Sequence, residues 1–257
     1  MRPWSLLRYL IEARTRYSVH SPFVYEFIEK VLRGRGDATW YRAAENTRRR
    51  MLRDHRTIPF EDFGTGGLRQ RHYPIRLSTI ARYSGRKKKE GRMLARLVAW
   101  TQPRHMLELG TSLGISSLYM ASACPEAQFI TLEGCKEVLE IARKNFLQAG
   151  FSSIQTLSGP FETTLPTLIA GGLRPDLVLF DGNHAHQPTL YYFHQLLPVI
   201  HADTVFVFDD IHWSAGMEKA WKEIAACPQV TLSVDIFSMG LVFFRSGIKK
   251  QHFILRF

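Results

Sequence analysis

The stretch "ELGTSLGIS", from Glu108 to Ser116, decides the fold that we predict for this chain of 257 residues. It ends a short apolar run and leads into a predicted helix, so it is typical of a tight turn from a strand into a helix. Gly110 and Gly114 let the backbone turn sharply and approach a ligand closely, and the next helix offers free N–H groups. The stretch predicts a binding loop, with a purely structural turn as the alternative.

The spacing of the two glycines narrows the kind of ligand. It is G-x-x-x-G, which lacks the G-x-G-x-x-G of dinucleotide folds and the Gly-Lys-Ser/Thr of a phosphate-binding loop. We therefore expect a nucleoside without a phosphate chain, and the spacing argues against an NAD-dependent enzyme.

Short apolar runs alternate with amphipathic stretches downstream of this turn, which is the pattern of an α/β fold. The expected strands are "HMLELG", "QFITLEG", "IQTLSG", "DLVLFDG", "TVFVFDD", "VTLSVDIF" and "GLVFFR". The runs "LVLF" and "VFVF" are apolar throughout, as parallel strands covered on both faces must be. Only "SM" separates the last two strands, so we expect them to pair as a hairpin. Residues 86–257 thus predict a doubly wound, mostly parallel sheet of seven strands with an antiparallel C-terminal hairpin.

Residues 1–85 predict a helical, basic segment in front of this domain. Ser21 and Pro22 are typical of a helix start, and "ATWYRAAENTRRRMLRDH" predicts a second helix. A stretch rich in Gly, Pro and charge follows from Thr57 to Arg76. Residues 1–100 hold 23 Lys and Arg against 9 Asp and Glu, whereas the remainder is weakly acidic. Such a segment suits nucleic acid, an anionic lipid surface or an anionic substrate. Solvated faces of Arg-rich helices are the plainer explanation.

The overall composition is that of a soluble globular protein, with 45% apolar and 22% charged residues. No apolar run approaches the roughly 20 residues that span a bilayer, and arginines interrupt the N-terminal stretch too early for a signal peptide. Three cysteines without a C-x-x-C pair suggest neither a disulfide framework nor a thiolate metal site. We therefore expect a cytoplasmic protein.

A second glycine-rich stretch, "EDFGTGG", lies between Glu61 and Gly67. No apolar strand is evident before it, and a proline follows where a cofactor-binding helix should begin, so we do not assign it to a cofactor. We expect Gly64, Gly66 and Gly67 to form a flexible loop over the carboxyl edge of the sheet, as part of an acceptor pocket. Arg69 and Arg71 would then be available to an anionic group.

The ends of the predicted strands hold the other candidate site residues, because ligands of open parallel sheets bind outside the carboxyl ends of the strands. Glu133 ends the second strand, where an acidic residue can accept both hydroxyls of a ribose. The fourth and fifth strands end in "DGNH" and "FDDIHW", which place Asp181, His184, Asp209 and Asp210 along the same edge. Gathered carboxylates suit a hard cation such as Mg²⁺, and His184 is a candidate general base. The alternatives are that Glu133 is a surface glutamate, that Asp181 caps the next turn and that His184 only hydrogen-bonds locally. Against a metal site, the adjacent Asp209 and Asp210 tend to point opposite ways on a strand.

With these residues the chain resembles the class I S-adenosylmethionine-dependent methyltransferases, most closely the branch of catechol and caffeoyl-CoA O-methyltransferases. The similar pieces are "EGRMLARLVAWTQPRHMLELGTSLGIS", "FITLEGC", "SGPFETTLP", "LVLFDGNH" and "VFVFDDIHW", which lie between about residue 90 and residue 245. The resemblance implies a Rossmann-like fold, S-adenosylmethionine as the cofactor, and Mg²⁺ or another divalent cation beside it.

The resemblance also implies a role for each site residue. It assigns cofactor contacts to the turn and strand-end residues Glu108, Gly110, Thr111, Ser112, Gly114, Glu133, Gly159, Phe161 and Asp181. Metal contacts fall on Asp181, Asp209 and Asp210, and catalysis on His184 and Asp181. Two positions depart from the branch, which usually has asparagine where Asp210 stands and lysine where His184 stands.

Three functions are compatible with this pattern. The first is methyl transfer to a small-molecule acceptor, an anionic one among the candidates, with a hydroxyl as the methylated group. The second is nucleic-acid methylation, although "DGNH" stands where amino-directed enzymes carry N-P-P-[YFW], and the chain contains no Pro-Pro. The third is cofactor binding without catalysis, and the sequence leaves a homodimer open.

Overall fold

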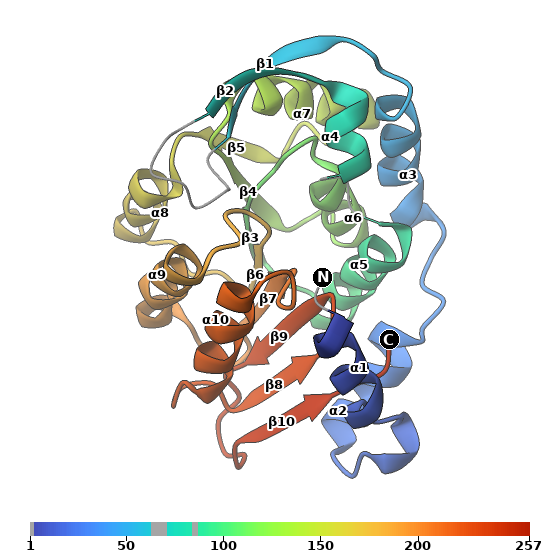
Figure 1. Ribbon diagram of the computed structural model, residues 1–257, viewed down its shortest axis with the longest axis vertical. Helices are drawn as coiled ribbons and strands as arrows, with labels where there is room; N and C mark the ends of the chain where they lie inside the picture. The colour runs from blue at the N-terminus through green and yellow to red at the C-terminus, as the bar shows by residue number, and fades with distance from the viewer. Residues whose placement is uncertain (1–2, 63–70, 84–86) are drawn as a thin grey trace.

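The computed structural model describes residues 3–62, 71–83 and 87–257 (Figure 1). The central sheet has eight strands in the order β10-β8-β9-β7-β6-β3-β4-β5. Its strands are β3 (His105–Leu109), β4 (Gln128–Glu133), β5 (Gln155–Ser158), β6 (Leu177–Phe180), β7 (Val205–Asp209), β8 (Leu232–Asp235), β9 (Met239–Phe243) and β10 (Gln251–Ile254). The doubly wound α/β class is therefore confirmed, with a short eighth strand, β10, added to the predicted seven.

One strand of this sheet runs against the others. β9 pairs antiparallel with both β7 and β8, whereas every other pairing in the sheet is parallel. The predicted C-terminal hairpin is β8 and β9, and β10 then returns beside β8 in the parallel sense.

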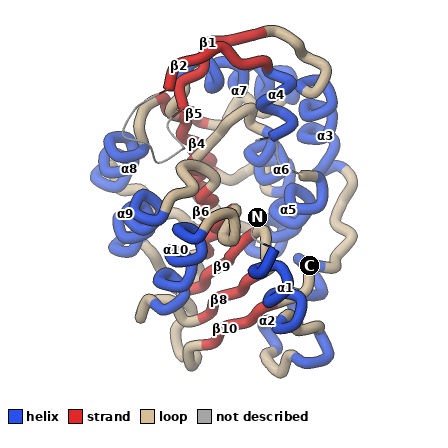
Figure 2. The backbone as a smooth tube through the Cα atoms, viewed as in Figure 1, coloured by secondary structure: helices blue, strands red, loops and turns tan. Residues whose placement is uncertain are grey.

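Helices cover both faces of the sheet, as the apolar strands require (Figure 2). The helices that flank this sheet from residue 88 onward are α5 (Lys88–Thr101), α6 (Ile115–Ala123), α7 (Lys136–Ala149), α8 (Phe161–Ala170), α9 (His186–Leu196) and α10 (Ala215–Ala226). Along β6, Leu177 and Leu179 enter one apolar core, while Val178 and Phe180 enter the other. Each residue of β6 is thus buried, because successive side chains of a strand point to opposite faces and both faces are covered here.

The front segment is largely helical and packs into the core on the α5 and α6 side. Its helices are α1 (Pro3–Glu12), α2 (Pro22–Phe27), a π-helical turn (Ile28–Leu32), α3 (Thr39–Met51) and α4 (Leu77–Tyr83). Ser21 caps α2 as predicted, since its hydroxyl accepts the N–H of Val24 at 3.4 Å. Arg96 of α5 is buried and donates to the carbonyl of Val31 at 2.6 Å, so part of the basic charge is structural.

An antiparallel ribbon of two strands lies in the stretch from Thr57 to Arg76 that is rich in Gly, Pro and charge. Its strands, β1 (Thr57–Asp62) and β2 (Arg71–Arg76), pair from Thr57 with Arg76 to Asp62 with Arg71. The expectation that no strand precedes the second glycine-rich stretch was therefore wrong. The backbone N–H of Glu61 lies 3.5 Å from the sulfur of Cys135, so the ribbon packs at the start of α7.

No helix in the described ranges is long and apolar enough to cross a membrane.

Candidate active site

The glycine turn lies where β3 leads into α6, at the carboxyl edge of the sheet. Gly110 has a φ of 108°, and its N–H donates to the carbonyl of Leu132 at 2.9 Å. A Cβ on residue 110 would lie 2.4 Å from the carbonyl oxygen of Asp181, so only glycine fits between β3 and the end of β6. Ser112 has a left-handed φ of 48°, which is uncommon for a residue with a side chain and is typical of a strained functional turn.

The side chain of Glu108 lies beneath this turn rather than on it. It is fully buried, and one carboxylate oxygen accepts hydrogen bonds from Ser117 at 2.5 Å and Thr131 at 2.7 Å. Thr131 also contacts the hydroxyl of Thr111 at 2.6 Å. This buried network ties α6 and β4 to the turn, so Glu108 holds the shape of the loop.

Glu133 lies at the end of β4 and reaches back to the glycine turn. Its two carboxylate oxygens accept the N–H of Ser112 at 2.8 Å and the N–H of Cys135 at 3.0 Å. Burial raises the pKa of the Glu133 carboxyl, and these backbone donors counteract part of that rise. A carboxylate can accept about four hydrogen bonds, so with the Gly134 N–H as a further donor it keeps room for a ligand hydroxyl.

Gly159 and Phe161 lie on the other side of Glu133, after β5. Gly159 has a φ of 138°, and its N–H donates to the carbonyl of Glu133 at 3.0 Å. The ring of Phe161 packs against the backbone of Gly182. A Cβ on residue 182 would lie 2.7 Å from a carbon of this ring. Phe161 also meets the ring of Tyr192 edge to face, with centroids 5.6 Å apart. Apolar rings therefore lie beside the polar end of β4 at Glu133.

Three of the predicted strand-end residues form one polar group. A ligand atom from each of Asp181, His184 and Asp209 lies within 4.8 Å of the other two, which is a spacing that can hold a metal ion. His184 Nε2 is 3.9 Å from Asp181 Oδ1. Asp210 is not in this group; its φ is 53° and its N–H donates to the carbonyl of Ser238.

The adjacent Asp209 and Asp210 therefore differ in where they lie. A donor set of two carboxylates and one imidazole fits several divalent cations, with the carboxylates suited to Mg²⁺ and the imidazole to softer metals. His184 lies beside Asp181, a position that suits either a metal ligand or a proton acceptor. The backbone carbonyl of Asp181 in turn contacts Gly110 of the glycine turn.

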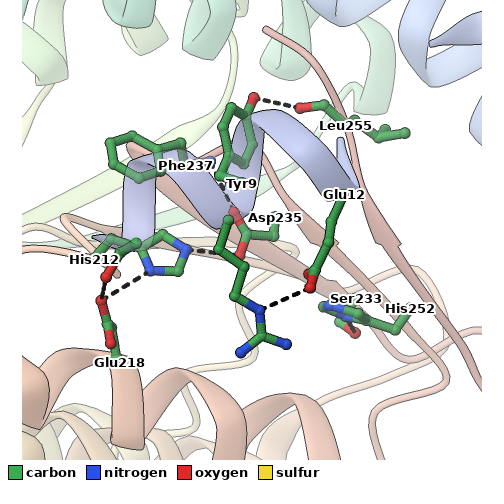
Figure 3. Close-up of polar contacts among 11 residues, drawn as sticks. Tyr9, Glu12, His212, Glu218, Ser233, Asp235, Phe237, His252 and Leu255 are labelled. Carbon is green, nitrogen blue, oxygen red and sulfur yellow. Dashed lines mark hydrogen bonds and ion pairs between the residues drawn. The ribbon is translucent and has the colours of Figure 1, made fainter. Parts of the chain in front are cut away.

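A second polar group at this edge was not predicted as a site. His212, three residues beyond Asp209, contacts Asp235 Oδ2 at 2.8 Å and Glu218 Oε1 at 3.5 Å (Figure 3). Burial lowers the pKa of His212, but the two carboxylates outweigh it and raise the pKa above its ordinary value. Asp235 ends β8, so the strand-end rule that selected Asp181 would also have found it.

The second glycine-rich stretch remains untested. Gly64, Gly66, Gly67 and Arg69 lie outside the described residues, as does the side chain of Arg71. The strand β1, which leads into this stretch, contacts the start of α7 through Glu61 and Cys135. Cys135 lies two residues after Glu133 in the chain.

Comparison with known proteins agrees with this architecture. Residues 107–211, from β3 to just beyond β7, match the model of a methyltransferase domain family. The catechol O-methyltransferase of Niastella koreensis is 33% identical over 125 residues, which cover 48% of this chain and 56% of that relative. The chain thus spans about half the length of the curated relative that it matches.

Solved structures resemble the chain over more of its length. An S-adenosylhomocysteine-bound methyltransferase from Podospora anserina has a TM-score of 0.60 and 16% identity, and the match covers 82% of this chain and 89% of that one. An O-methyltransferase from Streptomyces achromogenes, solved with S-adenosylmethionine, has a TM-score of 0.55 and 22% identity, covering 82% of this chain and 92% of that one. At these identities the likeness shows the fold alone.

Proposed function

We propose that this chain, which belongs to the class I S-adenosylmethionine-dependent methyltransferases of the catechol and caffeoyl-CoA type, transfers a methyl group to a hydroxyl oxygen of a small molecule. One observation carries the proposal. Glu133 accepts the N–H of Ser112 at 2.8 Å and Gly110 lies against the backbone of Asp181, so the acidic end of β4, the glycine turn and the end of β6 lie side by side.

Each of these parts has a proposed task toward the cofactor. Glu133 would accept the ribose hydroxyls, and Phe161 with Gly159 would contact the adenine. The turn from Gly110 to Gly114 would enclose the methionine part, with Glu108 supporting the turn from below through Ser117. S-adenosylmethionine supplies a methyl group already activated as a sulfonium, so the protein needs mainly to align the acceptor and remove its proton.

The group of Asp181, His184 and Asp209 supports a divalent-cation site. A bound cation would lower the pKa of the acceptor hydroxyl. In such a site His184, rather than Asp210, would be the third protein ligand. Without a cation, His184 is the proposed general base, because an imidazole ordinarily titrates near neutral pH.

Contacts of the basic segment favour a small acceptor over nucleic acid. Lys88 and Arg92 both pair with Glu45, at 3.3 and 2.7 Å. Arg50 donates to the side chain of Asn145 at 2.7 Å, and that side chain in turn donates to the carbonyl of Leu113 in the glycine turn. These cations support the fold of the cofactor domain, which leaves fewer of them for phosphates. A homodimer stays a prediction.

The test uses the purified chain and two measurements. Calorimetric titration should give saturable binding of S-adenosylmethionine, and labelled methyl groups should reach catechol or a related hydroxyl compound when a divalent cation is added. Absence of cofactor binding would overturn the proposal. Binding without transfer to any member of a hydroxyl-acceptor panel would instead favour a non-catalytic protein, and transfer to RNA or DNA would replace the small acceptor.

A further inference from the structure

Helix α1 packs on the rest of the protein through its polar side. This side lines a half-open cavity of about 360 Å³, whose other walls are α10, β8, β10 and His212. Tyr9 donates to the carbonyl of Leu255 at 2.6 Å (Figure 3). Ser5 donates to the carboxylate of Glu218. The four residues of α1 that line the cavity are Ser5, Arg8, Tyr9 and Glu12.

The opposite side of α1 is apolar and faces outward. Its five large apolar side chains are exposed, namely Trp4 (79%), Leu6 (42%), Leu7 (51%), Leu10 (47%) and Ile11 (77%). At about 100° per residue these five positions share one continuous arc of roughly 160°. A surface helix of a globular protein normally turns such an arc toward the core. Here α1 is inverted, so its apolar arc is the kind of exposed patch that marks an interaction site.

A basic pocket lies directly after this helix in the chain. It has a volume of about 70 Å³, and its walls include Arg14, Arg16, Arg33 and Arg256. The backbone of Arg14 bonds to Ile254 at 2.8 Å and to Arg256 at 3.0 Å, which fixes the pocket at the end of the sheet.

Positive charge dominates this pocket. Among the described residues, Glu29 is the carboxylate that pairs with its arginines, at 3.1 Å from Arg16 and 3.9 Å from Arg33. Four guanidinium groups against one carboxylate suit an anionic group such as a phosphate diester, which arginine binds well.

We propose that α1 and the arginine pocket bind the surface of a bilayer that contains anionic phospholipid. The apolar arc would enter the boundary between headgroups and acyl chains, with Trp4 at the depth that tryptophan prefers. The arginines would bind the phosphate headgroups next to it. The proposal does not depend on methyl transfer.

The size of the apolar arc favours a bilayer over a second protein. A helix of 10 residues is about 15 Å long and about 10 Å wide, whereas a stable protein interface buries about 800 Å² on each partner. An interfacial helix needs no such area, because lipid surrounds its apolar side and headgroup charge adds to the attraction.

Flotation of the full chain with vesicles tests the proposal. The protein should float with vesicles of phosphatidylcholine and phosphatidylglycerol, and not with vesicles of phosphatidylcholine alone. The double variant Leu7→Glu/Ile11→Glu should lose binding, and Arg14→Gln/Arg256→Gln should weaken it on the order of tenfold. The matched control, Arg82→Gln/Arg104→Gln, removes the same charge from exposed positions elsewhere and should bind as the unmodified chain does.

Circular dichroism checks that the variants fold, which the exposure of Leu7 and Ile11 leads us to expect. Equal flotation of the Leu7→Glu/Ile11→Glu variant and the unmodified chain would overturn the proposal. So would the absence of flotation together with a dimer, seen by sedimentation, that the same variant separates. In that case the arc is an interface between two copies of the chain.

Discussion

The α-carbon of Gly110 faces the backbone of Asp181 so closely that a Cβ on residue 110 would lie 2.4 Å from the Asp181 carbonyl oxygen. This contact joins the turn after β3 to the end of β6. The two proposed halves of the site, for cofactor and for metal, therefore share one backbone contact, and a change on one side displaces the other.

Replacement of Gly110 by alanine should damage both stability and cofactor binding. The φ of 108° is strained for alanine and the new methyl group meets the backbone of Asp181, so we expect a loss of about 3 kcal/mol in the free energy of unfolding. Gly150→Ala is the matched control, because Gly150 also has a positive φ, 82°, but nothing within 4 Å of a Cβ. It should cost about 1 kcal/mol and leave cofactor affinity unchanged. Urea unfolding and calorimetry measure both quantities, and equal effects would refute the contact.

Glu133→Ala should lower the affinity for S-adenosylmethionine by between about tenfold and a hundredfold, since hydrogen bonds to a charged group are lost. Glu126→Ala, which removes an equal charge from an exposed turn, should have no effect. Because burial raises the pKa of Glu133, affinity should fall with decreasing pH before the ordinary carboxyl range near pH 4.3 is reached. The Glu133→Ala variant should lack this decline, and a parallel decline in both would contradict the assignment.

Metal binding distinguishes the adjacent aspartates. Asp209→Asn and His184→Gln should each weaken binding of Mn²⁺, followed by calorimetry without cofactor or acceptor, by about tenfold or more. Asp210→Asn should stay within about twofold, because Asp210 lies outside the group of Asp181, His184 and Asp209. If Asp210→Asn weakens Mn²⁺ binding more than Asp209→Asn does, Asp210 rather than Asp209 is a metal ligand. Unaltered Mn²⁺ affinity in all three variants would leave His184 as the general base.

The pair of His212 and Asp235 should make stability depend on pH. The raised pKa of His212 means that its contribution is fully present below the unfolded value of about 6.5, and is lost as pH rises through the folded pKa. His212→Asn should therefore cost more stability at pH 6 than at pH 9.

His252, on β10 in the same cavity, supplies the control with the opposite sign. Partial desolvation lowers the pKa of His252 although the residue is exposed, so its neutral form is favoured in the folded chain and the cost of His252→Asn should be slightly smaller at pH 6 than at pH 9. Urea unfolding at the two pH values gives both differences. The same pH trend in both variants would show that the ion pair of His212 does not control stability.

Much of the fold could be predicted because the decisive strands are apolar on both faces. The run from Leu177 to Phe180 is fully buried, and its four consecutive apolar residues predict a parallel strand covered on both faces. The ribbon of β1 and β2 escaped prediction because each strand contains a proline, Pro59 and Pro74, and these pair with each other where neither needs an N–H. β10 is four residues long, too short for a periodic signal.

The site could be predicted in part for a related reason. Strand ends converge at one edge of a parallel sheet, so Glu133 and Asp181 follow from topology alone. Asp209 lies near His184, whereas Asp210 has a left-handed backbone conformation and lies outside that group. No pattern in the sequence predicts the left-handed conformation of Asp210. The inversion of α1 could not be predicted either, because an amphipathic surface helix normally turns its apolar side toward the core.

The sulfur of Cys135 lies buried beneath the ribbon, 3.5 Å from the N–H of Glu61, and burial raises the pKa of its thiol. A maleimide or iodoacetamide reagent can reach this sulfur only after β1 has lifted from α7. With Cys124 and Cys227 replaced by serine, the rate of alkylation would therefore count openings of the ribbon. If a bound nucleoside slows that rate, binding near Glu133 stabilises the contact between β1 and α7. This measurement does not require the methyl acceptor to be known.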